Sequence, residues 1–124
     1  MVLELEEMIR QEPDIHKREI LRKLLPLNQK ASVHMEQKRK SFAQKYREMF
    51  SKKFWKEARL LLRDYYLEKG KSICNSCKKE INGSFTIHHD FYPQKSYDIF
   101  TPLYVKIVHS NRVCHPPGVP KRTP

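Results

Sequence analysis

The residue types that bind metal ions gather in the second half of the sequence. All three cysteines and four of the six histidines lie between residues 74 and 115. Cys74 and Cys77 are separated by two residues, a spacing typical of a turn that supplies two sulfur ligands to one zinc ion. A structural zinc site has four nitrogen or sulfur ligands in a tetrahedron. The sequence therefore predicts a zinc site whose other two ligands come from a second turn.

The segment 109–115 offers three candidates for the remaining zinc ligands, His109, Cys114 and His115. We expect His109 and Cys114 to complete the site, because this choice leaves His115 available for another role. The alternative is that the three cysteines are buried apolar residues without a metal ion, since free cysteine is among the most buried residue types. The predicted structural zinc ligands are Cys74, Cys77, His109 and Cys114.

The remaining histidines of this segment, His88, His89 and His115, suggest a second kind of site. Neighbouring side chains on a strand point to opposite faces, so His88 and His89 are not expected to bind the same ion. One is expected to be a metal ligand and the other a base. An imidazole with a pKa near neutrality removes a proton from water. With a divalent ion held by the other histidines, the pattern indicates hydrolysis of a phosphodiester.

The order of these residues resembles that of the HNH endonucleases, which carry a ββα-metal site. The residues that match lie within 51–115: Trp55 and Arg59 on a predicted helix, the cysteines Cys74 and Cys77, the run Ile87-His88-His89, and the pair Cys114-His115. The resemblance implies that His88 and His115 bind a catalytic divalent ion, Mg²⁺ or a similar one. It further implies that His89 is the general base, and it matches the paired cysteines with a structural zinc clamp. The expected activity is a metal-dependent DNA endonuclease.

Two features of the sequence depart from the HNH pattern. Asn111, the nearest candidate for the asparagine of the motif, lies only four residues before His115. We predict a catalytic role for Asn111, and the alternative is that it belongs to the zinc knuckle. The family also has a helix directly after its last histidine, whereas the prolines and glycine of 116–120 exclude one here. Either the chain is a divergent copy that only binds DNA, or another element, such as the predicted helix 51–69, supports the site.

The charge of the chain favours a polyanionic partner. Lys and Arg number 25 against 14 Asp and Glu, a net charge of +11. By segment the net charge is −1 for 1–24, +7 for 30–69 and +5 for 71–124. The alternative is that Lys-rich helix faces are merely solvated surface. We predict DNA as the partner, bound through its phosphates. The expected contact residues are Lys38, Arg39, Lys40, Lys52 and Lys53.

The pattern of apolar residues predicts an α+β fold in two parts. Helices are expected in a basic arm, 1–50, where Pro26 is expected to end a helix and 28–32 to form a polar joint. The second part, 51–124, is expected to be the HNH-like module with a Pro-rich tail. It begins with a helix whose apolar stripe is Phe54, Ala58, Leu61, Leu62 and Tyr65. Strands are predicted at 85–87 and 104–108, with Asn82-Gly83 as a hairpin turn between strands.

The sequence gives weaker indications of location and assembly. Residues 1–13 are acidic and resemble no secretory signal, and no apolar run is long enough to cross a membrane. We therefore expect a cytoplasmic or nucleoid-associated protein that is not secreted and does not bind membranes. A homodimer through the helices of 1–25 is a conjecture. The alternatives to a nuclease are a catalytically inactive, zinc-stabilised module that binds nucleic acid, and a helical interaction protein.

Overall fold

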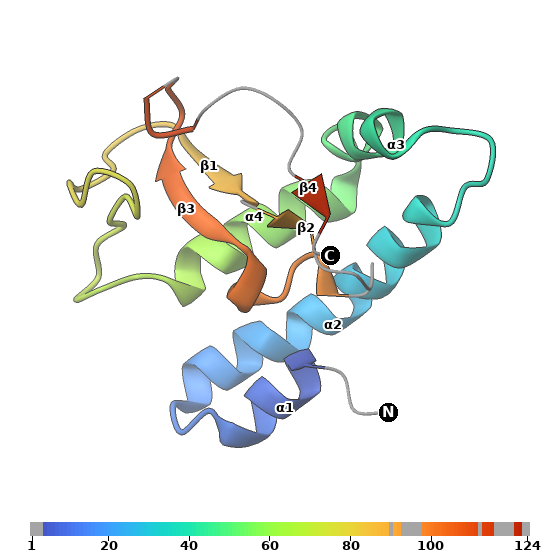
Figure 1. Ribbon diagram of the computed structural model, residues 1–124. Helices are drawn as coiled ribbons and strands as arrows, with labels where there is room; N and C mark the ends of the chain where they lie inside the picture. The colour runs from blue at the N-terminus through green and yellow to red at the C-terminus, as the bar shows by residue number, and fades with distance from the viewer. Residues whose placement is uncertain (1–3, 90, 93–97, 112, 116–120, 123–124) are drawn as a thin grey trace.

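The computed structural model describes residues 4–89, 91–92, 98–111, 113–115 and 121–122, and Figure 1 shows helices followed by short strands. Within these residues the helices are α1 (Glu4–Gln11), α2 (Ile15–Met35), α3 (Phe42–Met49) and α4 (Lys53–Tyr65). The strands are β1 (Phe85–His88), β2 (Phe91–Tyr92), β3 (Lys106–His109) and β4 (Lys121–Arg122), and a short 3-10 helix, η2 (Pro102–Tyr104), precedes β3. The predicted α+β class is confirmed.

Helix α2 is longer than the sequence predicted, because it continues through Pro26 to Met35. A proline inside a helix removes a backbone hydrogen bond and costs about 3 kcal/mol. Leu24, Leu27 and Ala31 nevertheless lie along one face of α2 and are buried in the core. Burying a leucine side chain contributes roughly 2 kcal/mol, so two of them outweigh the cost of the proline. The predictions of a helix end at Pro26 and a joint at 28–32 are wrong.

Helix α4 lies between α2 and the strand pair β1–β3 (Figure 1). The predicted stripe is confirmed, because Ala58 and Leu62 are fully buried and Phe54, Leu61 and Tyr65 pack against the same core. Trp55 is also buried, as predicted for a residue that packs. From the same helix, Arg59 donates a hydrogen bond of 2.8 Å to the backbone carbonyl of Phe85 in β1. Helix α4 thus contacts both the helices before it and the strand pair after it.

Strands β1 and β3 pair in an antiparallel register that sets Phe85 opposite His109 and His88 opposite Lys106. The segment between them spans 89–105, so they do not form a tight hairpin. Asn82-Gly83 precedes β1 and does not join two strands, so the predicted hairpin turn is wrong. The chain before it folds back on itself at the isolated bridge between Ile73 and Glu80, and the strand partner of β1 comes from later in the sequence. Strands β2 and β4 form a separate parallel pair of two residues each.

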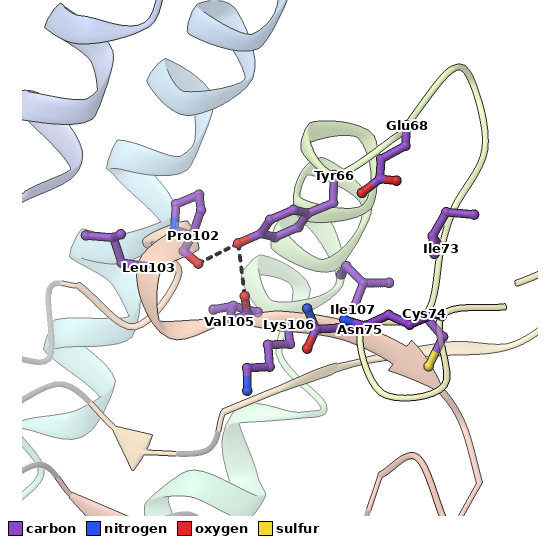
Figure 2. Close-up of a pocket in the computed structure, with 11 residues that line it drawn as sticks. Tyr66, Glu68, Ile73, Cys74, Asn75, Pro102, Leu103, Val105, Lys106 and Ile107 are labelled. Atoms are coloured by element: carbon purple, nitrogen blue, oxygen red, sulfur yellow. Dashed lines mark hydrogen bonds between the residues drawn. The ribbon is translucent and has the colours of Figure 1, made fainter. Parts of the chain in front are cut away.

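Tyr66, just after α4, ties this helix to the segment that leads into β3. Its hydroxyl lies 2.5 Å from the backbone carbonyl oxygen of Pro102 and 3.0 Å from that of Val105 (Figure 2). Burial raises the pKa of this hydroxyl well above its usual value, so Tyr66 remains a neutral hydrogen-bond donor. A hollow of about 470 Å³ lies beside it, with Glu68, Lys78 and Lys106 among its lining residues.

One hydrophobic core contains side chains from both parts of the chain. It extends from Leu5 in α1 through α2, α3 and α4 to Ile107 in β3 and Cys114. The two predicted parts, 1–50 and 51–124, therefore share one core. Whether either part folds by itself stays a prediction.

The predicted irregular tail, 116–124, lies outside the described residues except for β4. None of the described helices has the length and hydropathy needed to cross a bilayer.

Candidate metal centre

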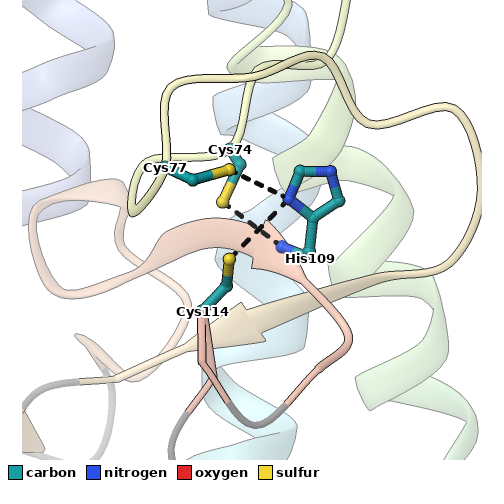
Figure 3. A group of neighbouring side chains, drawn as sticks. All are labelled: Cys74, Cys77, His109 and Cys114. Carbon is teal, nitrogen blue, oxygen red and sulfur yellow. Dashed lines mark hydrogen bonds between the residues drawn. The ribbon is translucent and has the colours of Figure 1, made fainter.

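Four side chains, from the loop before β1, the end of β3 and the loop after it, meet at one end of the β1–β3 pair (Figure 3). They are Cys74, Cys77, His109 and Cys114, here called the Cys₃His cluster. One ligand atom from each residue lies within 4.8 Å of the ligand atoms of the other three. The four residues therefore lie close enough to hold a metal ion, as the sequence predicted. Three sulfurs and one imidazole are a donor set that suits zinc.

The first loop of the cluster is a tight knuckle around the two paired cysteines. The Lys78 backbone N–H donates to the Cys74 carbonyl at 2.9 Å, and the Cys74 N–H donates to the Lys79 carbonyl at 2.9 Å. Lys78 has a positive φ of 66°, which lets the chain reverse direction directly after Cys77. The knuckle is joined to the sheet by the N–H of Asn75, which donates to the Ile107 carbonyl in β3 at 2.8 Å.

The second loop of the cluster is shaped by Asn111. Its side-chain Oδ1 accepts hydrogen bonds from the backbone N–H of Val113 at 3.0 Å and of Cys114 at 2.7 Å. Its carbonyl accepts from the N–H of His115 at 2.8 Å. An asparagine that bonds the backbone two and three residues ahead stabilises a turn. Asn111 therefore sets the positions of Cys114 and His115, and the catalytic role predicted for it remains a prediction.

The electrostatic surroundings of the cluster favour metal binding. Burial raises the pKa of the Cys74 thiol, but hydrogen bonds from the backbone of Cys77 and His109 outweigh this effect and lower the pKa to about 6. Cys74 is therefore disposed to be a thiolate at neutral pH, which is the form that binds metals. Burial raises the pKa of Cys114, and proximity to the other two cysteines adds to that rise. A divalent cation relieves this repulsion between sulfurs.

His109 is oriented as a ligand through one particular nitrogen. Its Nδ1 lies 3.4 Å from the sulfur of Cys77 and 3.9 Å from that of Cys114. Its Nε2 lies 3.2 Å from the backbone carbonyl of Glu80, which requires a proton on Nε2. The lone pair of Nδ1 then points toward the sulfurs. Hydrogen bonds of this kind from the far nitrogen are the usual support of a metal-binding imidazole.

His88 and His115 lie next to each other beside the Cys₃His cluster, and are here called the histidine pair. Their ring centroids are 5.0 Å apart and their planes are nearly perpendicular, at 86°. His88 is half-buried on the open face of β1, and His115 follows Cys114 directly in the chain. Burial lowers the pKa of His115, and the nearby His88 lowers it further. The neutral imidazole, which is the form that binds metals, is therefore favoured at His115.

His89 points to the opposite face from His88, as the alternation of a strand predicted. Its side chain is only 1% exposed and lies among the aromatic rings of Tyr46 and Trp55. Its Nε2 lies 2.7 Å from the backbone carbonyl oxygen of Ile99, so Nε2 carries the proton and Nδ1 is the basic nitrogen. The structure thus brings the rings of His88 and His115 together, whereas the His89 ring is buried among aromatic residues.

No sequence motif marks the side chain that holds the turn behind His89. Asn28, buried in α2, accepts from the Phe100 backbone N–H at 2.6 Å and donates to the Thr101 hydroxyl at 3.2 Å. The Thr101 hydroxyl in turn donates to Asp98 at 3.0 Å. Because Ile99 lies within this turn, Asn28 helps to position the carbonyl that orients His89. The only signal in the sequence was a polar residue at the helical spacing of Leu24, Leu27 and Ala31.

We expect replacement of Asn28 by alanine to destabilise the protein and loosen the turn behind His89. The variant Asn28→Ala leaves the buried Phe100 N–H without its acceptor, at a cost of about 1–3 kcal/mol. Urea unfolding measures this loss, and the NMR resonances of the His89 ring report its orientation. Gln29→Ala is the matched control, since Gln29 is exposed on the same helix. Equal stability and unchanged His89 resonances in the Asn28 variant would contradict the role.

The predicted DNA-contacting residues lie on either side of α3, in the loop before it and in the loop after it up to the first residue of α4. Lys38, Arg39 and Lys40 precede α3, and Lys52 and Lys53 follow it at the start of α4. Lys40 forms an ion pair of 2.8 Å with Glu48, and Lys53, which is 91% exposed, lies 3.9 Å from Glu57. Lys38, Arg39 and Lys52 are exposed. Both loops therefore carry positive charge that is accessible to a polyanion.

The sites described above are assigned from the residues and the geometry alone. Comparison of the chain with protein-family models, with curated proteins and with solved structures yields no significant match.

Proposed function

We propose that the protein is a metal-dependent DNA endonuclease of the HNH type. The observation that carries this proposal is the arrangement of the three histidines. His88 and His115 meet at 5.0 Å on one face of β1, while His89 is anchored to a backbone carbonyl on the other. Of the family's sequence order, two adjacent histidines followed by a terminal Cys-His, the first and last histidines meet here in space, next to a candidate zinc site.

The Cys₃His cluster is proposed as a structural zinc site. All four protein ligands are present, and closed four-ligand sites are structural, whereas catalytic zinc sites keep a position open. The proposed role is to hold the two loops together. The turn that carries Cys114 also carries His115, so the zinc ion would fix the distance between His115 and His88 on β1.

The histidine pair is proposed to hold the catalytic ion, Mg²⁺ or a similar divalent cation. When bound, this ion supplies positive charge that stabilises the leaving 3′ oxygen. The role of the chain is to provide two neutral imidazoles on one face and to leave the other coordination positions open to phosphate oxygen and water. The low pKa of His115 supports this role, because protons compete weakly for its lone pair.

His89 is proposed as the general base. Its Nδ1 takes a proton from water, the water oxygen attacks phosphorus, and the bond from phosphorus to the 3′ oxygen breaks as that oxygen gains a proton from a second water molecule. The Ile99 carbonyl holds the ring in the tautomer that this step requires. The ring is buried, so substrate binding must bring the reacting water to Nδ1. Catalytic hydrogen bonds often reach their working geometry only in the substrate complex.

Helix α4 supports the proposal from an unexpected position in the sequence. HNH enzymes have a helix after the last histidine, and this chain has prolines there. Helix α4 precedes the strands, yet it packs against β1, with the Arg59 guanidinium 4.3 Å from the centre of the Phe85 ring. We propose that α4, within the segment 51–69, takes over the support of the site, one of the alternatives that the sequence left open.

Nicking of supercoiled plasmid tests the proposed function. We expect the wild-type protein to convert supercoiled plasmid to the open circular form with added Mg²⁺, Mn²⁺ or Ni²⁺, and not without an added ion. DNA binding at low salt is expected to weaken steeply as salt increases, because phosphate contacts release counterions. If the protein binds the plasmid but cuts it with none of these three ions, the nuclease assignment is contradicted.

A second candidate is a zinc-stabilised module that binds nucleic acid without cutting it. The observation that favours it is the burial of His89, which as a core residue would pack among Tyr46 and Trp55 rather than react. In this case the basic loops and the Cys₃His cluster keep their roles, and the histidine pair has none in catalysis. The plasmid assay separates the two candidates directly.

A further inference from the structure

An aromatic hollow lies next to the histidine pair, with His115 among its lining residues. Its lining residues are Tyr46, Phe50, Trp55, Arg59, Thr86, Ile87 and His115. Three of these are aromatic residues from α3, from the loop after it and from α4. The hollow thus joins the helical half of the protein to the site proposed for catalysis.

The rings of the hollow form an edge-to-face cluster around Phe50. The Phe50 ring centre lies 4.8 Å from that of Tyr46 and 4.8 Å from that of Trp55. Tyr46 and Trp55 are buried, but Phe50 is 43% exposed. A phenylalanine with nearly half of its surface in water presents a ring face to which another flat ring can stack.

The size and the polar groups of the hollow restrict which ligands it can bind. Its volume is about 220 Å³. An apolar cavity of roughly 150 Å³ holds a benzene ring, so this hollow accommodates one planar ring system and not a base pair. Arg59 and Thr86 place polar side chains among the lining residues. The combination of ring faces with a few polar groups is typical of sites that bind single nucleobases.

The position of the hollow indicates what the planar ring is attached to. His115 belongs both to the hollow and to the histidine pair, whose rings are 5.0 Å apart. Lys52 and Lys53 directly follow the loop that carries Phe50 and are exposed. A ligand that suits this position therefore carries negative charge near the two lysines and a phosphate next to the histidine pair.

We propose that the aromatic hollow binds one unstacked nucleobase of the DNA strand, next to the phosphate at the histidine pair. The proposal rests on the proposed function, because that function places the scissile phosphate there. Phe50 supplies the stacking face, and the base must leave its stack to enter. The hollow therefore gives the protein a preference for single-stranded or distorted DNA over regular duplex.

Binding of two oligonucleotides tests this site without any cleavage step. One probe is a fluorescein-labelled dT 12-mer, and the other has the same phosphates with abasic sugars at every position. Both are measured without added divalent ion. We expect Phe50→Ala to weaken binding of the dT 12-mer about tenfold, the effect of losing one base–aromatic stack, and to leave the abasic probe unchanged.

Three further substitutions keep the test independent of folding. Phe50→Leu retains an apolar side chain of similar size without a ring and should behave as Phe50→Ala, whereas Phe50→Tyr should bind as the wild type. Ile15→Ala removes another exposed apolar side chain, at the start of α2, and should change nothing. An equal loss of affinity for both probes in Phe50→Leu, or no loss for either, would overturn the proposal.

The oligonucleotide test and the plasmid assay can fail independently of each other. A ring-dependent preference for the dT probe without plasmid nicking supports the base site and contradicts the nuclease. Plasmid nicking combined with binding that ignores Phe50 supports the nuclease and contradicts the base site.

Discussion

Removal of the zinc ion proposed for the Cys₃His cluster is expected to unfold the β1–β3 pair and the loops around it. A structural zinc site contributes apparent binding free energies of roughly 10–16 kcal/mol. This matches or exceeds the total stability of a small domain, about 5–15 kcal/mol. Cys74 and Cys114 belong to the common hydrophobic core, so the loss is expected to reach beyond the two loops.

Hydrogen exchange of the backbone amides measures this effect directly. The amides of β1 and β3 are expected to lose their protection when a strong chelator is added and to regain it with added zinc. His109→Ala should reproduce the effect of the chelator. His16→Ala is the matched control, because His16 is an exposed histidine far from the cluster. Unchanged protection of β3 in the metal-free protein would show that the cluster is only a group of packed side chains.

Replacement of His89 by glutamine is expected to abolish plasmid nicking while leaving DNA binding intact. Loss of a general base lowers a rate by about 100- to 10,000-fold. Glutamine retains an N–H that can reach the Ile99 carbonyl, but it lacks a basic nitrogen. The fold should therefore survive the change better than with alanine.

The chain contains a closely matched control for this variant. His34 is also buried, and its Nε2 lies 2.7 Å from a backbone carbonyl oxygen, that of Lys45. His34→Gln therefore makes the same chemical change in a similar environment within the α2–α3 contact. We expect it to nick plasmid as the wild type does. A comparable loss of nicking in both variants would show that the effect comes from disturbed packing. Nicking by His89→Gln at the wild-type rate would refute the role of His89 as the general base.

The parts of the fold that the sequence predicted are those fixed by local spacing. The stripe along α4 follows from residues three and four apart, and the Cys74–Cys77 knuckle from a short turn. The opposite directions of His88 and His89 follow from the alternation of a strand. The grouping of His109 with the cysteines was also predictable, because few metal-binding residue types were available in the second turn.

The parts that the sequence did not predict depend on contacts between distant segments. Pro26 should break a helix locally, and only the burial of Leu24, Leu27 and Ala31 against the rest of the core keeps α2 continuous. Asn28 bonds to a turn more than 70 residues away, which no local pattern reveals. The pairing of β1 with β3 rather than with an adjacent segment likewise depends on tertiary contacts.

Metal content tests most directly whether the chain holds two separate kinds of metal site. After dialysis against metal-free buffer, the wild-type protein should retain one zinc ion per chain by elemental analysis. Titration with Mn²⁺, followed by electron paramagnetic resonance, should then reveal one weaker site. His88→Ala is predicted to lose the Mn²⁺ site and to keep its zinc. Undiminished Mn²⁺ binding by His88→Ala, or a dialysed wild-type protein without zinc, would contradict the assignment of the Cys₃His cluster and the histidine pair.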